Sequence, residues 1–288
     1  MAEATATIAA RPAAWRHWPL TFWIGLVVTG AIVIMTLFAP VLAPYPYDEM
    51  SILTRLRPPS ASHWFGTDDF GRDVLSRTLI GAQYSLMMGF GATIISFAVG
   101  VPAGLLAGYS GRTVDETIMR AMDVLMSFPP ILLGLLILTV TPPSHYKAMI
   151  AVGVVYIPAI VRIARSVTLE IAQEEFIQAA RARGDGTAYI LFREILPNAW
   201  PPLIVEAGLR VPFAILLAAA FSFLGMGAQP PSSDWGLMIS EARPYLEAAP
   251  WIALAPGIAM SVTVIGINLL GDGLRQVLDP RLTSGRSG

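Results

Sequence analysis

Long stretches without a charged residue dominate the chain. Five intervals of more than twenty residues contain no Asp, Glu, Lys or Arg, and each could supply the roughly 20 apolar residues with which a helix crosses a hydrocarbon core. A sixth interval follows Lys147 and is shorter, so a span there must hold Arg162 and Arg165 at its end. The pattern predicts spans near residues 20–43, 84–108, 117–140, 146–168, 202–225 and 251–272.

Helices are the expected spanning form, because backbone polar groups inside lipid must be satisfied within their own segment. We therefore predict an all-α membrane protein, a polytopic bundle of about six transmembrane helices. Composition agrees, since 55% of the residues are hydrophobic and only 14% are charged, where soluble domains have about a quarter charged. The first apolar run is too long for a typical signal peptide, so we interpret it as a retained helix.

Positive residues predict that both termini are cytoplasmic. Six spans place the two ends on one side, and this orientation puts eleven arginines inside against six Lys and Arg outside, as the positive-inside rule requires. The expected divisions are a cytoplasmic tail at 1–19, a first transmembrane helix at 20–43, a periplasmic loop at 44–83, a core domain at 84–275 with an inside loop at 169–201, and a cytoplasmic tail at 276–288.

Charge and composition exclude several function classes. The formal net charge is −1 and the chain has no cysteine, so we expect no nucleic-acid partner, no disulfide and no thiolate metal site. Lys147 is the only lysine and falls outside the membrane, so the chain lacks the lysine of a P-loop. Acids lie in loops or at helix ends, and we predict no catalytic residue and no metal site. If ATP drives the protein, a partner must bind it.

One charged segment stands apart from this apolar chain: QAARARGDGTAYILFREILP, residues 178–197. Good helix formers predict a helix over 169–183, with Gly184 following its end in a left-handed conformation. Thr187 is predicted to cap a second helix at 188–196, which Pro197 stops.

This element has two physical interpretations. It is a docking knob, in which small alanines let a partner backbone approach and exposed Phe176, Tyr189 and Phe192 fill a partner's pocket. Alternatively, it is an amphipathic loop that lies on lipid with its arginines at the headgroups.

The same residues carry a resemblance. Ala179-Ala180, three residues, Gly184 and then Leu196-Pro197 resemble the EAA loop of ABC-importer permeases, which docks into the ATPase subunit. Gln178 stands where that family has Glu, and Glu194 where its peptide branch often has His. Segments 66–77, 109–129, 223–239 and 256–282 resemble the C-type permease of dipeptide, oligopeptide and nickel importers, so the resemblance covers about residues 20–282.

The resemblance implies a function by alternating access in the bacterial inner membrane. Its implied partners are a B-type permease, two ABC ATPase subunits, a periplasmic substrate-binding protein and membrane lipids. ATP and Mg would bind to the ATPases, and no cofactor to this chain. The implied solute is a di- or oligopeptide, with nickel or another non-peptide solute as the alternative. The implied coupling residues are Glu175, Gln178, Ala179, Ala180, Gly184 and Leu196.

Four charged residues fall within predicted spans, where charges are costly and mark functional hypotheses. Arg120 and Asp123 are three residues apart, and Glu206 and Arg210 are four apart, so each pair can form on one helix. Either they are neutralised pairs near the cytoplasmic interface, or they face the aqueous path and brace a gate.

A motif in the predicted periplasmic loop combines Asp and Gly, which favour turns. A calcium loop is the weaker interpretation, because the EF-hand pattern is absent. In the resembled family this loop faces the periplasm, which implies the binding protein as its expected contact. The motif residues are Gly66, Thr67, Asp68, Gly71, Arg72 and Asp73.

Two rival functions require other features. An ion-driven secondary transporter would need unpaired acids at the bilayer midplane, and the central parts of the predicted spans lack them. A membrane enzyme would need a convergent nucleophile or metal set, and the sequence shows none. Small residues in the second span permit close helix packing. They are Gly89, Gly91, Gly100, Gly104 and Gly108.

Overall fold

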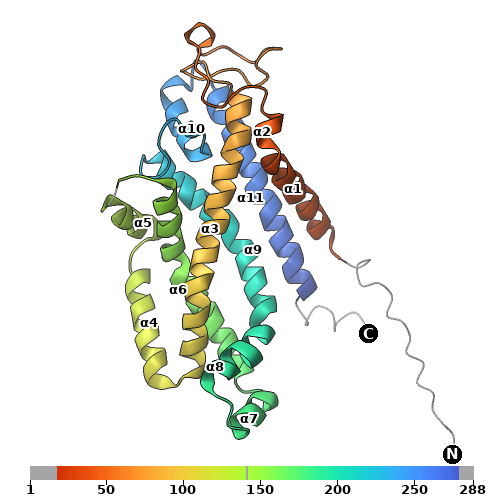
Figure 1. The fold of residues 1–288 in the computed structure, drawn as a ribbon, viewed down its shortest axis with the longest axis vertical. Coiled ribbons are helices and arrows are strands. Elements are labelled where there is room, and N and C mark those ends of the chain that lie inside the picture. The colour runs from red at the N-terminus through yellow and green to blue at the C-terminus, as the bar shows by residue number, and fades with distance from the viewer. Residues whose placement is uncertain (1–17, 141, 279–288) are drawn as a thin grey trace, which may run out of the picture.

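A bundle of long helices runs the length of the molecule (Figure 1). The computed structural model describes residues 18–140 and 142–278. Helices make up 76% of the structure, and the described residues contain no strand beyond the isolated bridge between Thr67 and Asp73. The predicted all-α class is therefore confirmed. Most of the predicted tails, 1–17 and 279–288, lies outside the described residues, and the domain division stays a prediction.

Within the described residues, five helices are long and apolar enough to span a membrane, or six if the bent pair α4–α5 is a single span. The long elements are α1 (Leu20–Leu37), α3 (Val74–Tyr109), α6 (His145–Ile171), α9 (Leu196–Phe223) and α11 (Trp251–Leu278). The shorter elements are α2 (Ala39–Leu42), η2 (Ile52–Thr54), α4 (Arg112–Met126), α5 (Pro130–Thr139), α7 (Glu175–Ala182), α8 (Thr187–Tyr189), η3 (Ile190–Ile195), α10 (Trp235–Ala242) and η4 (Arg243–Tyr245). We call the two ends of the bundle the α7 end and the α10 end (Figure 1).

The centre of the bundle is the contact between α3 and α6, and glycines let the two backbones approach. A Cβ on Gly104 would lie 2.5 Å from the Ala164 Cβ and 2.6 Å from the Val161 carbonyl oxygen. Gly100 and Gly108 meet α6 in the same way, one turn to either side, at Ile160 and Thr168. The predicted role of these small residues in close packing is confirmed.

Gly104→Ala is therefore expected to lower the thermal midpoint of the detergent-purified protein. The new methyl group meets backbone atoms and a Cβ, which can move away only if the helices shift. Overpacking of this kind lowers the stability of the folded protein by about 1–3 kcal/mol. Gly30 in α1 is the matched control, because a Cβ there meets nothing within 4 Å. Gly30→Ala should leave the midpoint unchanged or raise it, since alanine has the higher helix propensity. Equal effects of the two substitutions would contradict this packing role.

α1 and α11 pair at one edge of the bundle (Figure 1). They also touch through glycine, since Gly25 lies against the backbone of Leu270. Their outer faces carry large exposed apolar side chains, such as Val27, Ile34 and Ile265. An apolar surface of this extent on long helices is what a bilayer covers.

Two predicted spans differ clearly from the helices in the structure. α3 begins at Val74 rather than near 84, because the Asp73 side chain accepts a hydrogen bond from the Ser76 amide and caps the helix there. The span predicted at 117–140 is broken into α4 and α5, bent by 87°. Pro130 causes the break, because it forces Pro129 into an extended conformation with ψ 137°.

Pro197 does not end the helix before α9, which contradicts the sequence prediction. The helical stretch Thr187–Phe223 is continuous, and Pro197 lies in the first turn of α9. The π turn η3 directly precedes it. A wider turn relieves the clash between a proline ring and the carbonyl four residues earlier, so the helix continues through the proline.

Candidate functional site

α7 and η3 form a helix–turn–helix element that protrudes at the α7 end (Figure 1). The single helix predicted over 169–183 is wrong. α6 ends at Ile171, and Glu174 takes an extended conformation with ψ 147° before α7 starts at Glu175. This turn lets the apolar side of α7 face the bundle instead of solvent.

Ile177 and Ala180 make that contact. Both are fully buried, in one cluster with Ile190 and Leu191. Arg181 adds a polar link to Tyr109, the last residue of α3. The Arg181 Nε donates a hydrogen bond to the Tyr109 hydroxyl, and the two atoms are 3.2 Å apart. α7 is thus fixed to its own chain through this face.

The two motif alanines consequently differ in environment. Ala179 is exposed, whereas Ala180 is closed off by the chain's own core. The expectation that both alanines admit a partner backbone is therefore wrong for Ala180. Of the other predicted coupling residues, Glu175, Gln178 and Gly184 are exposed, and Leu196 is partly buried.

The turn after α7 has the geometry that the sequence predicts. Gly184 adopts φ +84°, its amide donates to the Arg181 carbonyl, and the Asp185 amide donates to the Ala180 carbonyl at 3.2 Å. These two bonds are the Schellman pattern of a helix end. Thr187 does not cap the next helix, because Gly186 occupies the N-cap position and no side chain caps α8.

Gly184→Ala is expected to loosen this turn without any steric clash. A Cβ on Gly184 would meet nothing within 4 Å, so the cost is the left-handed conformation itself, about 1–2 kcal/mol. Amide hydrogen exchange at Asp185 should speed up about tenfold, which corresponds to about 1.4 kcal/mol. Gly186→Ala is the control, since Gly186 has φ −69° and equally open surroundings. Faster exchange in both variants would argue against the conformational explanation.

Three large aromatic side chains are exposed on this element. Phe176 is 40% exposed, Tyr189 49% and Phe192 51%, as the sequence predicts. Exposed aromatic residues on a protruding helix are typical of interface hot spots. We call Phe176, Ala179, Tyr189 and Phe192 the α7-end surface.

Ion pairs lie on α4, α6 and α9 within the bundle. Glu206 and Arg210 pair on α9, as predicted. Asp123 does not pair with Arg120, which is exposed. Instead it accepts from Arg162 of α6 at 2.6 Å, because α4 lies along α6 and the interhelical partner is within reach. The carboxylate of Asp115 likewise binds Arg165 through two bonds of 2.5 and 2.6 Å.

A buried charge network fills the α10 end. Asp68 accepts from Arg72 Nε at 2.6 Å and from Arg77 Nη1 at 2.5 Å, and all three side chains are 1% exposed. Glu241 of α10 accepts from both arginines, at 3.2 and 3.1 Å. The network therefore fixes the loop before α3 to α10, over 160 residues away in sequence.

The rest of the predicted loop motif forms turns, as expected from Asp and Gly. Gly66 and Gly71 have φ +73° and +74°, and the Thr67 hydroxyl donates to the Thr54 carbonyl. Asp73 caps α3 and also lies 2.9 Å from His63 Nδ1. The sequence pattern does not predict Arg77 and Glu241 as site residues. Arg77 is the last residue of the motif segment 66–77, so its position is a signal that could identify it.

Burial raises the pKa values of two aspartates near this network. The pKa of Asp69 is raised, first by burial and then by the neighbouring charge of Asp68. Burial also raises the pKa of Asp234, which caps α10 by accepting from the Leu237 amide at 3.0 Å. Both carboxyl groups are therefore weaker acids than a solvent-exposed aspartate.

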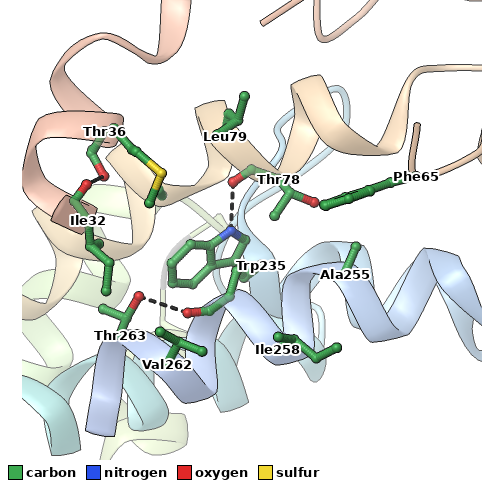
Figure 2. Close-up of a pocket in the computed structure, with 13 residues that line it drawn as sticks. Ile32, Thr36, Phe65, Thr78, Leu79, Trp235, Ala255, Ile258, Val262 and Thr263 are labelled. Atoms are coloured by element: carbon green, nitrogen blue, oxygen red, sulfur yellow. Dashed lines mark hydrogen bonds between the residues drawn. The ribbon is translucent and has the colours of Figure 1, made fainter. Parts of the chain in front are cut away.

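A cavity of about 240 Å³ lies beside Trp235 between α1, α3 and α11 (Figure 2). Trp235 Nε1 donates to the Thr78 carbonyl at 2.9 Å, which orients the indole along the cavity wall. The other lining side chains are mostly apolar, including Ile32, Ile258 and Val262. None of the predicted site residues lines this cavity.

Comparison with known proteins identifies the family. Residues 100–284 match the family model described as "Binding-protein-dependent transport system inner membrane component". The chain belongs to this family of transport permeases. Residues 21–59 match the "N-terminal TM domain of oligopeptide transport permease C", so the predicted resemblance to C-type permeases is confirmed.

Curated relatives of this permease match most of its length. A protein of Alkalihalophilus pseudofirmus named "Dipeptide transport system permease protein DppC" is 44% identical, over 91% of this chain and 86% of the relative. The "Probable D,D-dipeptide transport system permease protein DdpC" of Escherichia coli is 41% identical, over 89% and 88%. The "Glutathione transport system permease protein GsiD" of Pectobacterium atrosepticum is 40% identical, over 88% and 84%.

A solved structure supports the fold. A chain from an inward-facing structure of the MetNI methionine ABC transporter superposes with a TM-score of 0.59. The aligned region covers 72% of this permease and 96% of the MetNI chain, at 20% sequence identity. The likeness shows that the bundle is an ABC-importer permease fold.

Proposed function

We propose that this permease forms half of the translocation path of an ATP-driven importer for di- or oligopeptides. The observation that carries the proposal is the α7 element, which combines an EAA-like motif with a buried attachment to the bundle and an exposed aromatic surface. Dipeptides and glutathione in the names of three relatives support the peptide class.

Each end of the molecule has a partner in this proposal. The α7 end faces the cytoplasm and docks on an ABC ATPase, and two such ATPases bind ATP and Mg. The α10 end faces the periplasm, where the charge network around Asp68 holds a rigid platform for a substrate-binding protein. A second, B-type permease completes the path in the inner membrane, and both termini of this chain are cytoplasmic.

Disulfide cross-linking tests the coupling role. The chain has no cysteine, so Ala179→Cys introduces a single exposed thiol. We expect it to cross-link to cysteines placed across the ATPase surface, with an efficiency that changes when ATP is added. Ala180→Cys is the matched control, because its thiol is buried and should not react. Labelling of the thiol in Ala179→Cys from the periplasm, without any cross-link, would overturn the orientation and the coupling role.

Uptake by the reconstituted transporter tests the solute. Proteoliposomes that contain both permeases and the ATPases, supplied with binding protein and ATP, should accumulate a radiolabelled dipeptide. Accumulation of nickel in place of the dipeptide would favour the alternative solute class. Uptake that needs an ion gradient but not ATP would contradict the importer class altogether.

A further inference from the structure

The Glu206–Arg210 pair lies within a predicted span, ten and fourteen residues after the start of α9 at Leu196. The periplasmic end of α9 is Phe223, thirteen residues beyond Arg210, which places Arg210 about 20 Å below that end at about 1.5 Å per residue. A hydrocarbon core is about 30 Å thick, so the pair is within it. The side chains are nevertheless partly exposed, 25% for Arg210 and 15% for Glu206.

This exposure cannot face lipid tails. Charged groups at this depth are expensive in hydrocarbon, and they face the interior of an assembly or a water-filled cavity. The exposed edge of the pair is therefore expected to face the interior of the assembly or water rather than lipid.

Arg210 is held in one orientation on two sides. Its Nε donates to Glu206 Oε1, and its guanidinium lies over the ring of Tyr156 of α6, 5.5 Å from the centroid. Among residues 18–140 and 142–278, neither Nη1 nor Nη2 of Arg210 has a hydrogen-bond partner. A fixed guanidinium with a free edge is the geometry that binds a carboxylate through two parallel bonds.

We propose that Arg210 binds the carboxylate of the transported solute within the translocation path, with Glu206 and Tyr156 as positioning residues. The proposal rests on the proposed function as a peptide permease. A peptide carries a free α-carboxylate that loses its water on entering an apolar bundle, and Arg210 supplies the opposite charge there. Glu206 keeps the site nearly neutral, so the solute is bound weakly enough to leave again, as conduction requires.

The first test compares a peptide acid with its amide. Initial uptake rates of Ala-Ala and Ala-Ala-amide are measured in proteoliposomes with the complete transporter, each at a concentration that saturates the binding protein. Saturation is established by a separate binding measurement, so that selection by the binding protein does not contribute. We expect the wild type to prefer the acid, and Arg210→Gln to reduce the acid-to-amide ratio about tenfold.

One additional substrate tests which carboxylate of the peptide is recognised, and two further variants test whether the effect is specific to Arg210. Ala-Asp-amide carries its only carboxylate on a side chain, and full uptake of it would show that any carboxylate serves. Arg162→Gln removes another partly exposed arginine of the bundle and should keep the acid-to-amide ratio. Arg210→Lys retains the charge without the fork and should recover part of the preference.

A second readout does not depend on turnover. Phe213 is 54% exposed and lies three residues from Arg210 on α9, so Phe213→Cys places a thiol beside the site. Millimolar Ala-Ala should slow its labelling by a methanethiosulfonate reagent at least threefold, and Ala-Ala-amide should not. Arg210→Gln in this background should abolish the protection.

The outcomes separate the two proposals. No ATP-dependent uptake of Ala-Ala by the wild type would contradict the peptide function. Wild-type uptake with an unchanged acid-to-amide ratio and unchanged protection in Arg210→Gln would leave that function standing and refute the role of Arg210. Arg210→Gln protein that fails to assemble is judged on Arg210→Lys, whose ratio must then fall below that of the wild type.

Discussion

Asp68→Ala is expected to destabilise the α10 end by about 3–5 kcal/mol, the usual result when one partner of a buried ion pair is removed. Asp68 is the carboxylate that separates the guanidinium groups of Arg72 and Arg77, both 1% exposed. Without it the two cations face one another, and only Glu241, at 3.1 and 3.2 Å, and Asp69, 3.9 Å from Arg72 Nη2, remain to neutralise them. The thermal midpoint of the purified protein should fall by roughly 10 °C.

Glu241→Gln provides the comparison for this prediction, because it should cause a smaller loss of stability than Asp68→Ala. Glu241 is 16% exposed and accepts longer bonds, 3.1 and 3.2 Å, so water can replace part of what Glu241→Gln removes. The expected loss is about 1–2 kcal/mol. Tryptophan fluorescence reports the same region, because Trp251 Nε1 donates to the Thr67 carbonyl in the loop. A smaller effect of Asp68→Ala than of Glu241→Gln would show that Asp68 is not the centre of the network.

Hydrophobic patterning predicts the spans of this permease well, because the bilayer imposes length and apolarity on each segment. It predicts their ends less well. The first turns of α3, from Val74, contain buried Arg77, whose charge is neutralised by Asp68 in the preceding loop and by Glu241 of α10. A charged residue predicts a loop instead of a buried helix unless its partner is known. The partner Glu241 is 164 residues away from Arg77.

The candidate site shows the same limit. The turn at Gly184 is local chemistry, and the sequence predicts it correctly. The environments of Ala179 and Ala180 depend on how α7 packs against η3, which no local pattern contains. Asp123 likewise has an intrahelical partner at the right spacing but binds Arg162 of another helix. Spacing on one helix shows what is possible, and tertiary packing decides between the possibilities.

Ile177→Ala is expected to uncouple ATP hydrolysis from transport in the proposed importer. Ile177 is fully buried and joins α7 to the bundle, and loss of such a side chain costs about 2–5 kcal/mol. An eight-residue helix has little stability of its own, so α7 should move independently of α6 and α9. Uptake should fall at least tenfold, while the assembled transporter still hydrolyses ATP.

Phe176 is the matched control for this prediction, since it precedes Ile177 but points to solvent. Phe176→Ala removes part of the α7-end surface and leaves the attachment intact. It should weaken binding of the ATPase subunit, measured by co-purification, whereas Ile177→Ala should retain that binding and lose uptake. A coupling element needs both a surface that the ATPase holds and a rigid connection to the spans. Normal uptake by Ile177→Ala would mean that movement of α7 reaches the spans through Arg181 and Tyr109 instead.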